Sequence, residues 1–213
     1  MIDSILSIDV RAIRMTTIAL YATDTMADWE YGYLTAGLAM AREQDANANR
    51  LIVASETGDA VTTMGGLRVT PDVALADLPT LDALILPGAS SWDSGHDAAL
   101  RIAAELVAAG TPVAAICGAT YGLARAGLLD DRPHTSNAAE FLTQAAEYRG
   151  AEYYREDKAV SDGTVITAGA TAPIEFAKLV FERLNVFPQP VVDAWYGLYT
   201  TGERKYYDQL AGA

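Results

Sequence analysis

The chemistry in this chain centres on Cys117, its only cysteine. Residues 112–116 before it form a short apolar run that predicts a buried strand, and a helical pattern begins at Gly118. A side chain at such a strand–turn–helix junction lies among free backbone N–H groups at the positive end of the helix dipole. This environment favours the thiolate and predicts a reactive thiol. The alternative is a small buried hydrophobe, the commonest role of a lone cysteine.

Two turns offer hydrogen-bond donors to a negative charge that would develop when this thiol attacks. Gly118 permits a tight turn, and its backbone N–H is a candidate oxyanion donor. The turn after residues 81–86 offers the N–H of Gly88 or Ala89, which we expect to aim at the same point. The alternative for residues 86–89 is a plain turn without a role in chemistry.

Glu30 is the candidate proton carrier, in the first turn of a helix predicted over residues 29–42. A carboxyl group beside a thiol shares a hydrogen bond with it if burial raises the carboxyl pKa. The alternative is an acid that only stabilises the helix dipole. His96 and His134 are the only histidines. Strand alternation turns His134 away from Asn137, and His96 lies near a helix start, so we expect structural roles for both.

Alternating strand and helix patterns must position these residues. The repeated βα units predict a single-domain, doubly wound α/β fold of the flavodoxin-like type, with a mostly parallel sheet flanked by helices. Sites in such folds lie at the carboxyl ends of the strands. Strands are predicted at 16–21, 51–55, 67–69, 81–86, 113–116, 134–136 and 165–168, with a hairpin partner at 160, and helices at 29–42, 98–109, 119–126, 138–148 and 173–184.

The carboxyl-end rule brings together four segments that are distant in sequence: 22–30, 87–93, 117–121 and 136–137. We expect them to form one pocket around the thiol. The side chains predicted to line this pocket are Asp28, Trp92, Thr120, Tyr121 and Asn137.

Size and charge narrow the function classes. The chain has 213 residues, which suits one domain over residues 15–213, with residues 1–14 expected to be a disordered extension. The tail from Val191 is rich in aromatic residues and predicts a helix that covers the domain or a partner subunit. A net charge of −13 argues against nucleic-acid binding, because phosphates would be repelled.

Other constellations are missing from the sequence. Residues 106–124 carry no charge, but Pro112 and several glycines break this stretch, so we expect no membrane span. We recognise no signal peptide and expect a cytoplasmic protein. No metal-ligand spacing or nucleotide-binding loop occurs, so no metal or cofactor is expected. Ser90, Ser91 and Ser136 show no suitable catalytic partner.

With these residues assembled, the chain resembles the DJ-1/PfpI superfamily, whose fold is shared with class I glutamine amidotransferase domains. The resemblance covers about residues 16–184. Residues 115–119 with 126–129 are similar to the family's nucleophile turn and helix, and they are the most specific match. The other matching segments are 27–30 with the acidic residue, 86–89 with Trp92 as the oxyanion turn, and 169–177 as the last core helix. The resemblance implies that Glu30 faces Cys117 and that the protein is a homodimer.

The departures from the family pattern bear directly on function. Many members have a histidine directly after the cysteine or in a Thr-Thr-His segment downstream. Here Gly118 follows Cys117, and residues 135–137 read Thr-Ser-Asn. Asn137 therefore occupies the histidine position, and an amide cannot take a proton at neutral pH. The stretch directly before Glu175 contains no histidine either, so neither glutamine hydrolysis by the usual triad nor PfpI-type proteolysis is implied.

The leading hypothesis is a cysteine-dependent hydrolase or lyase that acts on a small carbonyl, amide or isonitrile-like substrate. Cys117 would attack, Glu30 would carry the proton, and Gly88, Ala89 and Gly118 would hold the oxyanion. The alternative is a non-catalytic redox-sensing or stress-response protein whose Cys117 is selectively oxidised. A third reading is a ligand-binding module or assembly subunit with a vestigial pocket.

Overall fold

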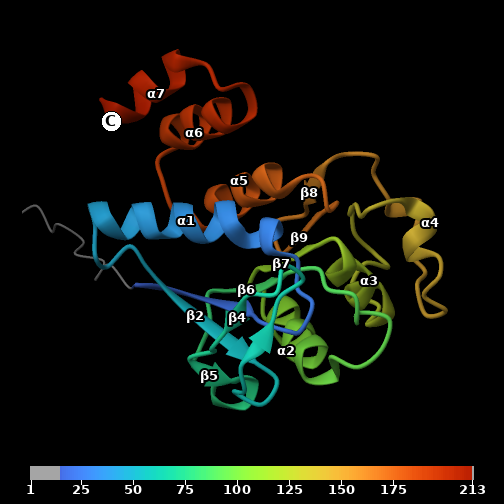
Figure 1. Cartoon of the computed structure of the whole chain (residues 1–213). Helices are drawn as coiled ribbons and strands as arrows, with labels where there is room; N and C mark the ends of the chain where they lie inside the picture. The colour runs from blue at the N-terminus through green and yellow to red at the C-terminus, as the bar shows by residue number, and fades with distance from the viewer. Residues whose placement is uncertain (1–14, 213) are drawn as a thin grey trace, which may run out of the picture.

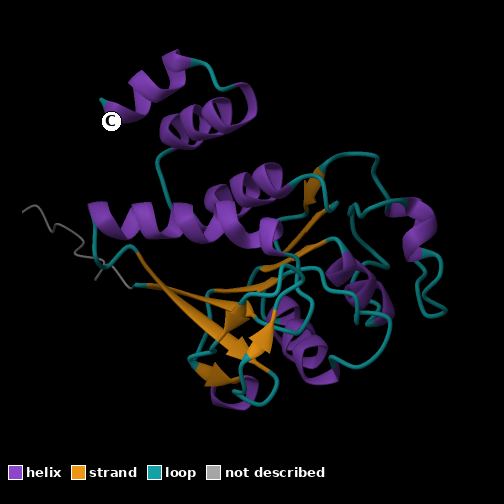
Figure 2. Ribbon diagram, in the orientation of Figure 1, coloured by secondary structure: helices purple, strands orange, loops and turns teal. Residues whose placement is uncertain are grey.

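The computed structural model describes residues 15–212, and the extension expected over residues 1–14 lies outside them (Figure 1). A central sheet is flanked by helices on both faces (Figure 2). The strands are β1 (Thr16–Tyr21), β2 (Asn49–Ser55), β3 (Val61–Thr62), β4 (Arg68–Val69), β5 (Val73–Ala74), β6 (Ala83–Leu86), β7 (Val113–Ile116), β8 (Ala159–Ser161) and β9 (Val165–Ala168). The helices are α1 (Asp28–Gln44), α2 (Asp97–Ala108), α3 (Gly118–Arg125), α4 (Ala139–Leu142), α5 (Pro173–Leu184), α6 (Gln189–Thr201) and α7 (Arg204–Ala211), with short 3-10 turns η1 (Leu75–Asp77) and η2 (Ala151–Tyr153).

The main sheet has seven strands in the order β5-β2-β1-β6-β7-β9-β8. Every neighbouring pair is parallel except β8 with β9, which is antiparallel and joined by a turn at Asp162-Gly163. Strands β1, β6 and β7 are therefore adjacent, and their carboxyl ends open at one edge. This arrangement confirms the predicted α/β class and places residues 22–30, 87–93 and 117–121 after neighbouring strands.

The strands are apolar on both sides because helices cover both faces of the sheet. One core lies between the sheet and α2 and α3, and it contains Leu84, Leu86 and Ala115. The other lies between the sheet and α1, α5 and α6, and it contains Ile85 and Ile116. Neighbouring residues of one strand thus belong to opposite cores, as the alternation of side chains in a strand requires.

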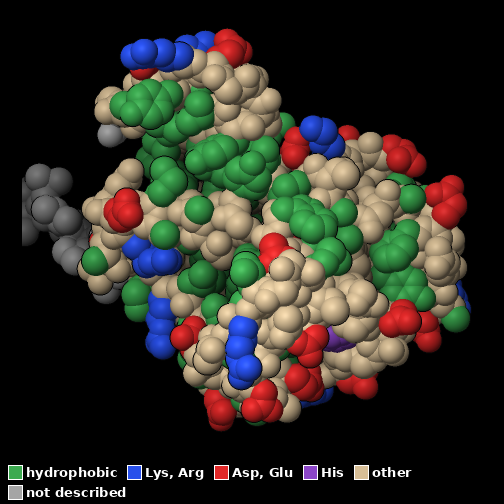
Figure 3. Space-filling view, in the orientation of Figure 1, with side chains coloured by type: hydrophobic (Ala, Val, Ile, Leu, Met, Phe, Trp, Pro, Cys, Tyr) green, Lys and Arg blue, Asp and Glu red, His purple; other side chains and the backbone are tan. Residues whose placement is uncertain are grey.

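The C-terminal tail differs from the single helix that we predicted. Gly202 ends α6 with a φ of 70°, a left-handed conformation that glycine adopts without steric cost, and the chain then turns into α7. Figure 3 shows apolar side chains gathered where α6 and α7 lie over α1. The rings of Trp195 and Tyr199 lie 6.2 and 5.2 Å from the ring of Tyr33 on α1, so the aromatic residues dock α6 onto the sheet's covering layer.

Two local predictions were wrong. Residues 134–136 form no strand and make only an isolated bridge from His134 to Tyr154. The helix expected over 138–148 is α-helical only from 139 to 142, and turns follow it. In both cases a short apolar pattern was read as a longer element than the neighbouring segments support. The strand predicted at 67–69 is present as β4 over residues 68–69, and it pairs with β3 in a separate hairpin.

No helix within residues 15–212 has the length and apolar character needed to cross a membrane.

Two glycines of α1 give a matched test of how tightly this layer packs. A Cβ on Gly37 would overlap the ring of Phe181 on α5, whereas a Cβ on Gly32 meets nothing within 4 Å. We expect Gly37→Ala to lower the free energy of unfolding by about 1–3 kcal/mol through overpacking. Gly32→Ala should raise it by up to about 1 kcal/mol, because alanine is the better helix former. Urea unfolding measures both, and equal effects of the two changes would contradict the packing.

Candidate active site

Cys117 lies on a strained turn between β7 and α3. Its φ of 57° and ψ of −123° are unusual for a residue with a side chain, and such strain is typical of functional sites. Its N–H donates to Ala168 O at 2.9 Å, and its carbonyl accepts from Thr120 Oγ1 at 2.6 Å. These two bonds hold the turn, and the half-buried thiol points out of the end of the sheet.

Thr120 therefore has a different role from the one predicted. It is fully buried, it binds the Cys117 carbonyl, and it pairs with Ser136 Oγ at 2.6 Å. It does not line the pocket but fixes the backbone of the cysteine turn. Asp28 is also misplaced by the prediction: its Oδ2 accepts the Gly65 N–H at 2.7 Å and ties α1 to the loop between β3 and β4.

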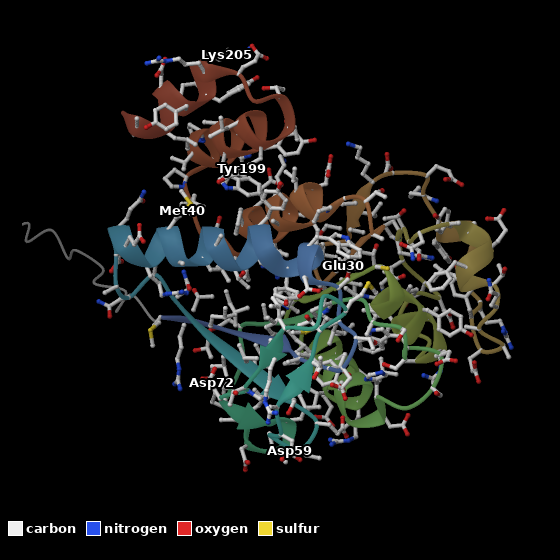
Figure 4. The ribbon with its side chains drawn as sticks, in the orientation of Figure 1. Glu30, Met40, Asp59, Asp72, Tyr199 and Lys205 are labelled. Atoms are coloured by element: carbon white, nitrogen blue, oxygen red, sulfur yellow. The ribbon has the colours of Figure 1, made fainter. Side chains whose placement is uncertain are left out.

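Glu30 lies in the first turn of α1, at the N-terminal end of the helix, which lies over the carboxyl edge of the sheet (Figure 4). Its side chain is completely buried, and Oε2 accepts the Gly88 N–H at 2.6 Å. The other oxygen, Oε1, is buried without a hydrogen-bond partner among the described residues. A side-chain hydrogen bond with Cys117 lowers the pKa of Glu30. The two groups are therefore placed to share a proton.

The predicted oxyanion donors separate into two kinds. The Gly88 N–H is bonded to Glu30 and is not available to a substrate, which corrects its assignment as a donor. Gly88 is instead a spacer: a Cβ there would lie 2.7 Å from both Cys117 Cβ and Glu30 Oε2. Within residues 15–212, the Ala89 N–H bonds to no acceptor, and the Gly118 N–H faces the Cys117 sulfur. Ala89 and Gly118 thus remain as the candidate pair of donors.

Burial controls the ionisation of both groups. It raises the pKa of Glu30 to about 7, although the Gly88 N–H partly opposes the shift. Burial and the charge of Glu30 raise the pKa of Cys117 to about 11, although Asn137 and the Gly118 N–H act in the opposite direction. The raised pKa of Glu30 is the condition under which we expected the carboxyl group to share a hydrogen bond with the thiol. The low thiol pKa expected from the helix terminus is wrong, because loss of hydration outweighs the backbone donors.

Asn137 contacts the thiol where a histidine was expected. Its Nδ2 donates to Cys117 Sγ at 3.3 Å, and its Oδ1 accepts the Ala170 N–H at 2.8 Å. The Ala170 N–H can only donate, so it fixes the amide with its oxygen inward and its nitrogen toward the sulfur. Asn137 stabilises negative charge on the sulfur but cannot take the proton.

Neither histidine is available to Cys117. His134 is completely buried, with Nδ1 bonded to Arg132 O at 2.8 Å and Nε2 to Tyr148 Oη at 2.7 Å. His96 binds Tyr21 Oη through Nδ1 and Ser91 Oγ through Nε2, both at 2.9 Å. Burial lowers the pKa of both histidines, so both favour the neutral form. The expectation that both are structural is consistent with these contacts.

The bond between Ser91 and His96 corrects the statement that Ser91 lacks a partner. This pair belongs to a support for Trp92, whose ring stacks on His96 with the ring centroids 4.2 Å apart. Trp92 Nε1 donates to Pro87 O at 2.9 Å, and a Cβ on Gly122 would overlap its ring. Trp92 therefore fixes the turn after β6 against α3.

A pocket of about 350 Å³ opens beside the thiol. Of the predicted lining residues, it includes Trp92, Tyr121 and Asn137. Sequence reasoning missed Asp93, which lies in the predicted 87–93 loop, and Phe141 and Gln144. The last two lie three positions apart after Asn137, a spacing that would have placed them together on one helical turn. The complete lining is Ala89, Ser90, Trp92, Asp93, Cys117, Gly118, Tyr121, Asn137, Phe141 and Gln144.

The described residues contain no group of three or more His, Cys, Asp or Glu side chains that could hold a metal ion.

The fold and this site define a class of α/β proteins that present a cysteine on a strained strand–helix turn beside a buried glutamate. The chain belongs to the DJ-1/PfpI family, whose model matches residues 16–183.

Relatives and solved structures agree with this assignment. The chain is 39% identical over 199 residues to the Bacillus subtilis (strain 168) protein named "Uncharacterized protease YoaZ", covering 91% of this chain and 95% of that protein. A ThiJ/PfpI family protein from Bacillus anthracis has a TM-score of 0.87 and 38% identity, over 93% of this chain and 97% of that chain. A DJ-1 superfamily protein from Agrobacterium tumefaciens has a TM-score of 0.78 and 35% identity, over 88% and 99% of the two chains.

Removal of the amide donor should make the thiol harder to ionise. Asn137→Leu keeps the approximate size of the side chain but removes the N–H that lowers the pKa of Cys117. We expect the rate of alkylation by iodoacetamide at neutral pH to fall roughly threefold to tenfold, because one pKa unit changes the thiolate fraction tenfold. Gln144→Leu is the control, since it changes the same pocket without contacting the sulfur. Equal rates in Asn137→Leu and the parent protein would exclude this role of the amide.

The buried carboxyl group should make stability depend on pH. Its pKa rises from 4.5 to about 7 on folding, so Glu30 favours the folded state most below pH 4.5, and this stability is lost as pH rises to about 7. Glu30→Gln keeps an acceptor for Gly88 but does not titrate. We expect the variant to gain roughly 3 kcal/mol relative to the parent over this interval. Urea unfolding of both proteins across this pH range measures the difference, and a pH-independent difference would contradict the raised pKa.

Proposed function

We propose that the protein is a cysteine-dependent hydrolase or lyase that acts on a small molecule with an electrophilic carbonyl, amide or isonitrile-like carbon. Cys117 is the nucleophile, and Glu30 is the proton carrier, since among residues 15–212 it is the titratable side chain that interacts with the thiol. The pocket volume of about 350 Å³ lies at the low end of ligand sites and favours a small molecule over a folded polypeptide.

The first step joins the sulfur to the electrophilic carbon. The thiol proton passes to Glu30 Oε1 as the carbon–sulfur bond forms, and the π electrons of the carbonyl move to its oxygen. The N–H groups of Ala89 and Gly118 stabilise the oxyanion. A carboxylate whose pKa is about 7 can both take and return a proton near neutral pH, which suits general acid–base catalysis.

The second step depends on the substrate. With an amide, the oxyanion collapses, the carbon–nitrogen bond breaks, and Glu30 returns the proton to the leaving amine. Water then hydrolyses the thioester and restores the thiol. With an isonitrile, the proton is returned to the adduct, and water displaces the sulfur to give a formamide. Glu30 serves as base and then acid in both cases.

The observation that carries the proposal is the buried Glu30, whose Oε1 has no hydrogen-bond partner among the described residues and whose side chain interacts with the thiol on its strained turn. Burial of a carboxyl oxygen without a hydrogen bond costs stability, and such a cost is typical of a group retained for chemistry. The names of two Bacillus subtilis relatives as proteases, at 39% and 30% identity, support a hydrolase more generally.

The redox-sensing alternative requires a thiolate near neutral pH, because the thiolate is the form that peroxide oxidises. A Cys117 pKa raised to about 11 argues against that requirement and favours a thiol that is deprotonated by Glu30 during attack. Selective oxidation of Cys117 by mild peroxide, detected by mass spectrometry, would instead support the alternative.

The proposal is tested with a panel of 2-oxoaldehydes, isonitriles and small amides. We expect turnover of at least one class, with kcat/KM reduced at least about a thousandfold in Cys117→Ser and about 10²–10⁴-fold in Glu30→Gln. Glu30→Gln retains an acceptor for the Gly88 N–H, so its loss of activity would report the proton rather than the fold.

Asp28→Asn is the matched control, because Asp28 is an acid on the same helical turn that does not line the pocket. It should retain parental activity. Turnover that persists in Cys117→Ser would exclude Cys117 as the nucleophile.

A further inference from the structure

The pocket beside Cys117 is lined, among residues 15–212, by one acidic side chain and by no basic side chain. Its walls are aromatic and amide side chains, with the rings of Tyr121 and Phe141 5.3 Å apart. Asp93 is the one charged residue among those that line it. Asp93 is exposed, and its recorded contact is a long hydrogen bond of 3.4 Å from Ser94 Oγ. No basic side chain within residues 15–212 pairs with it.

Two cations that contact the surroundings of the pocket, Arg125 and Lys158, have partners outside it. Arg125 on α3 directs its guanidinium to Trp92 O at 3.2 Å and to Gly95 O at 3.4 Å, behind the Trp92 wall. Lys158 lines the adjoining cavity on the other side of Asn137, but its Nζ is paired with Glu175 at 2.7 Å. Neither side chain lines the pocket beside the thiol, so neither is placed to pair with an anionic ligand there.

The remaining donors in the pocket are neutral groups: the backbone N–H groups, the hydroxyls of Ser90 and Tyr121, and the amides of Asn137 and Gln144. In the proposed reaction the N–H groups of Ala89 and Gly118 serve the oxyanion, and Asn137 Nδ2 donates to the sulfur. A carboxylate or phosphate on the substrate would therefore lose hydration without gaining a cation, while facing the charge of Asp93. Such like-charge contacts discriminate against anionic ligands.

We propose that this pocket selects uncharged or cationic electrophiles and excludes those that carry a carboxylate or phosphate. The proposal rests on one part of the function proposed above, namely that Cys117 is the group that contacts the substrate. It narrows the substrate class of that site to small neutral or basic carbonyl, amide or isonitrile compounds with an apolar part.

Two alkylating reagents of nearly equal size test the selection without any need for turnover. Iodoacetamide is neutral and iodoacetate is an anion, and both react with the same thiolate, so their rate ratio does not depend on the pKa of Cys117. The ratio is measured by intact-mass spectrometry on the full chain, which has no second cysteine. The references are 2-mercaptoethanol and the urea-unfolded protein. We expect the folded protein to discriminate against iodoacetate at least roughly tenfold more than either reference.

Charge variants identify the source of the discrimination. Asp93→Asn should recover roughly threefold of the iodoacetate rate, and Asp93→Lys should recover more. The matched control is Asp59→Asn, an exposed acid at the far end of the molecule from Glu30 (Figure 4). It removes the same charge from the chain and should leave the ratio unchanged, which separates the pocket from the overall charge of −13.

The outcomes separate this inference from the function on which it rests. A folded-state ratio equal to the references, or equal effects of the Asp93 and Asp59 variants, would overturn the charge selection and leave the Cys117 chemistry standing. Absence of labelling by both reagents would overturn the charge selection together with the accessible thiol. Discrimination without turnover of any panel compound would support the selection and contradict the catalytic proposal.

Discussion

The hydrogen bond from the Gly88 N–H to Glu30 Oε2 is the constraint on which the rest of the site depends. It joins the first turn of α1 to the turn after β6, and it does so inside the protein, where a carboxyl group is otherwise costly. This bond holds the carboxyl group in place beside Cys117, which is its side-chain hydrogen-bond partner. Glycine is required at residue 88, because a Cβ would intrude between the two reactive side chains.

The thiol and the carboxyl group control each other's ionisation through this arrangement. Loss of hydration raises the pKa of both, the charge of Glu30 raises the pKa of Cys117 further, and the hydrogen bond from Cys117 lowers the pKa of Glu30. The pair therefore holds a proton near neutral pH, and the proton is better assigned to the pair than to one residue. Asn137 contributes a donor to the sulfur but adds no third titrating group. This distinguishes the site from a Cys–His–acid triad, in which a separate base is always present.

The strands and helices that carry the site could be predicted from sequence, because each is a long or strongly apolar pattern. Strand β7 and helix α5 have the predicted bounds, and Cys117 lies at the predicted junction. The failures have a common physical origin. The roles of Gly88 and Thr120 depend on which neighbour accepts or donates a hydrogen bond, and no local pattern records that choice. The thiol pKa depends on burial, whereas the sequence shows only the adjacent helix terminus.

Phe141 and Gln144 were missed for a related reason. Phe141 lies within the four-residue helix α4, and Gln144 lies in the turn that follows it, so their position near the thiol is set by the path of an irregular segment rather than by a long periodic pattern. The pocket beside the thiol is therefore the part of the molecule least accessible to sequence reasoning. Its rear wall, by contrast, is Trp92, which the predicted turn after β6 already included.

The positive φ of Cys117 lowers the stability of the fold at the same position that carries the thiol. A residue with a side chain is strained at a φ of 57°, at a cost of about 1–3 kcal/mol, whereas glycine is not. The replacement that best relieves this strain is thus the one that removes the sulfur. A glycine at residue 117 is therefore expected to stabilise the fold, whereas the cysteine keeps a thiol there at the cost of that strain.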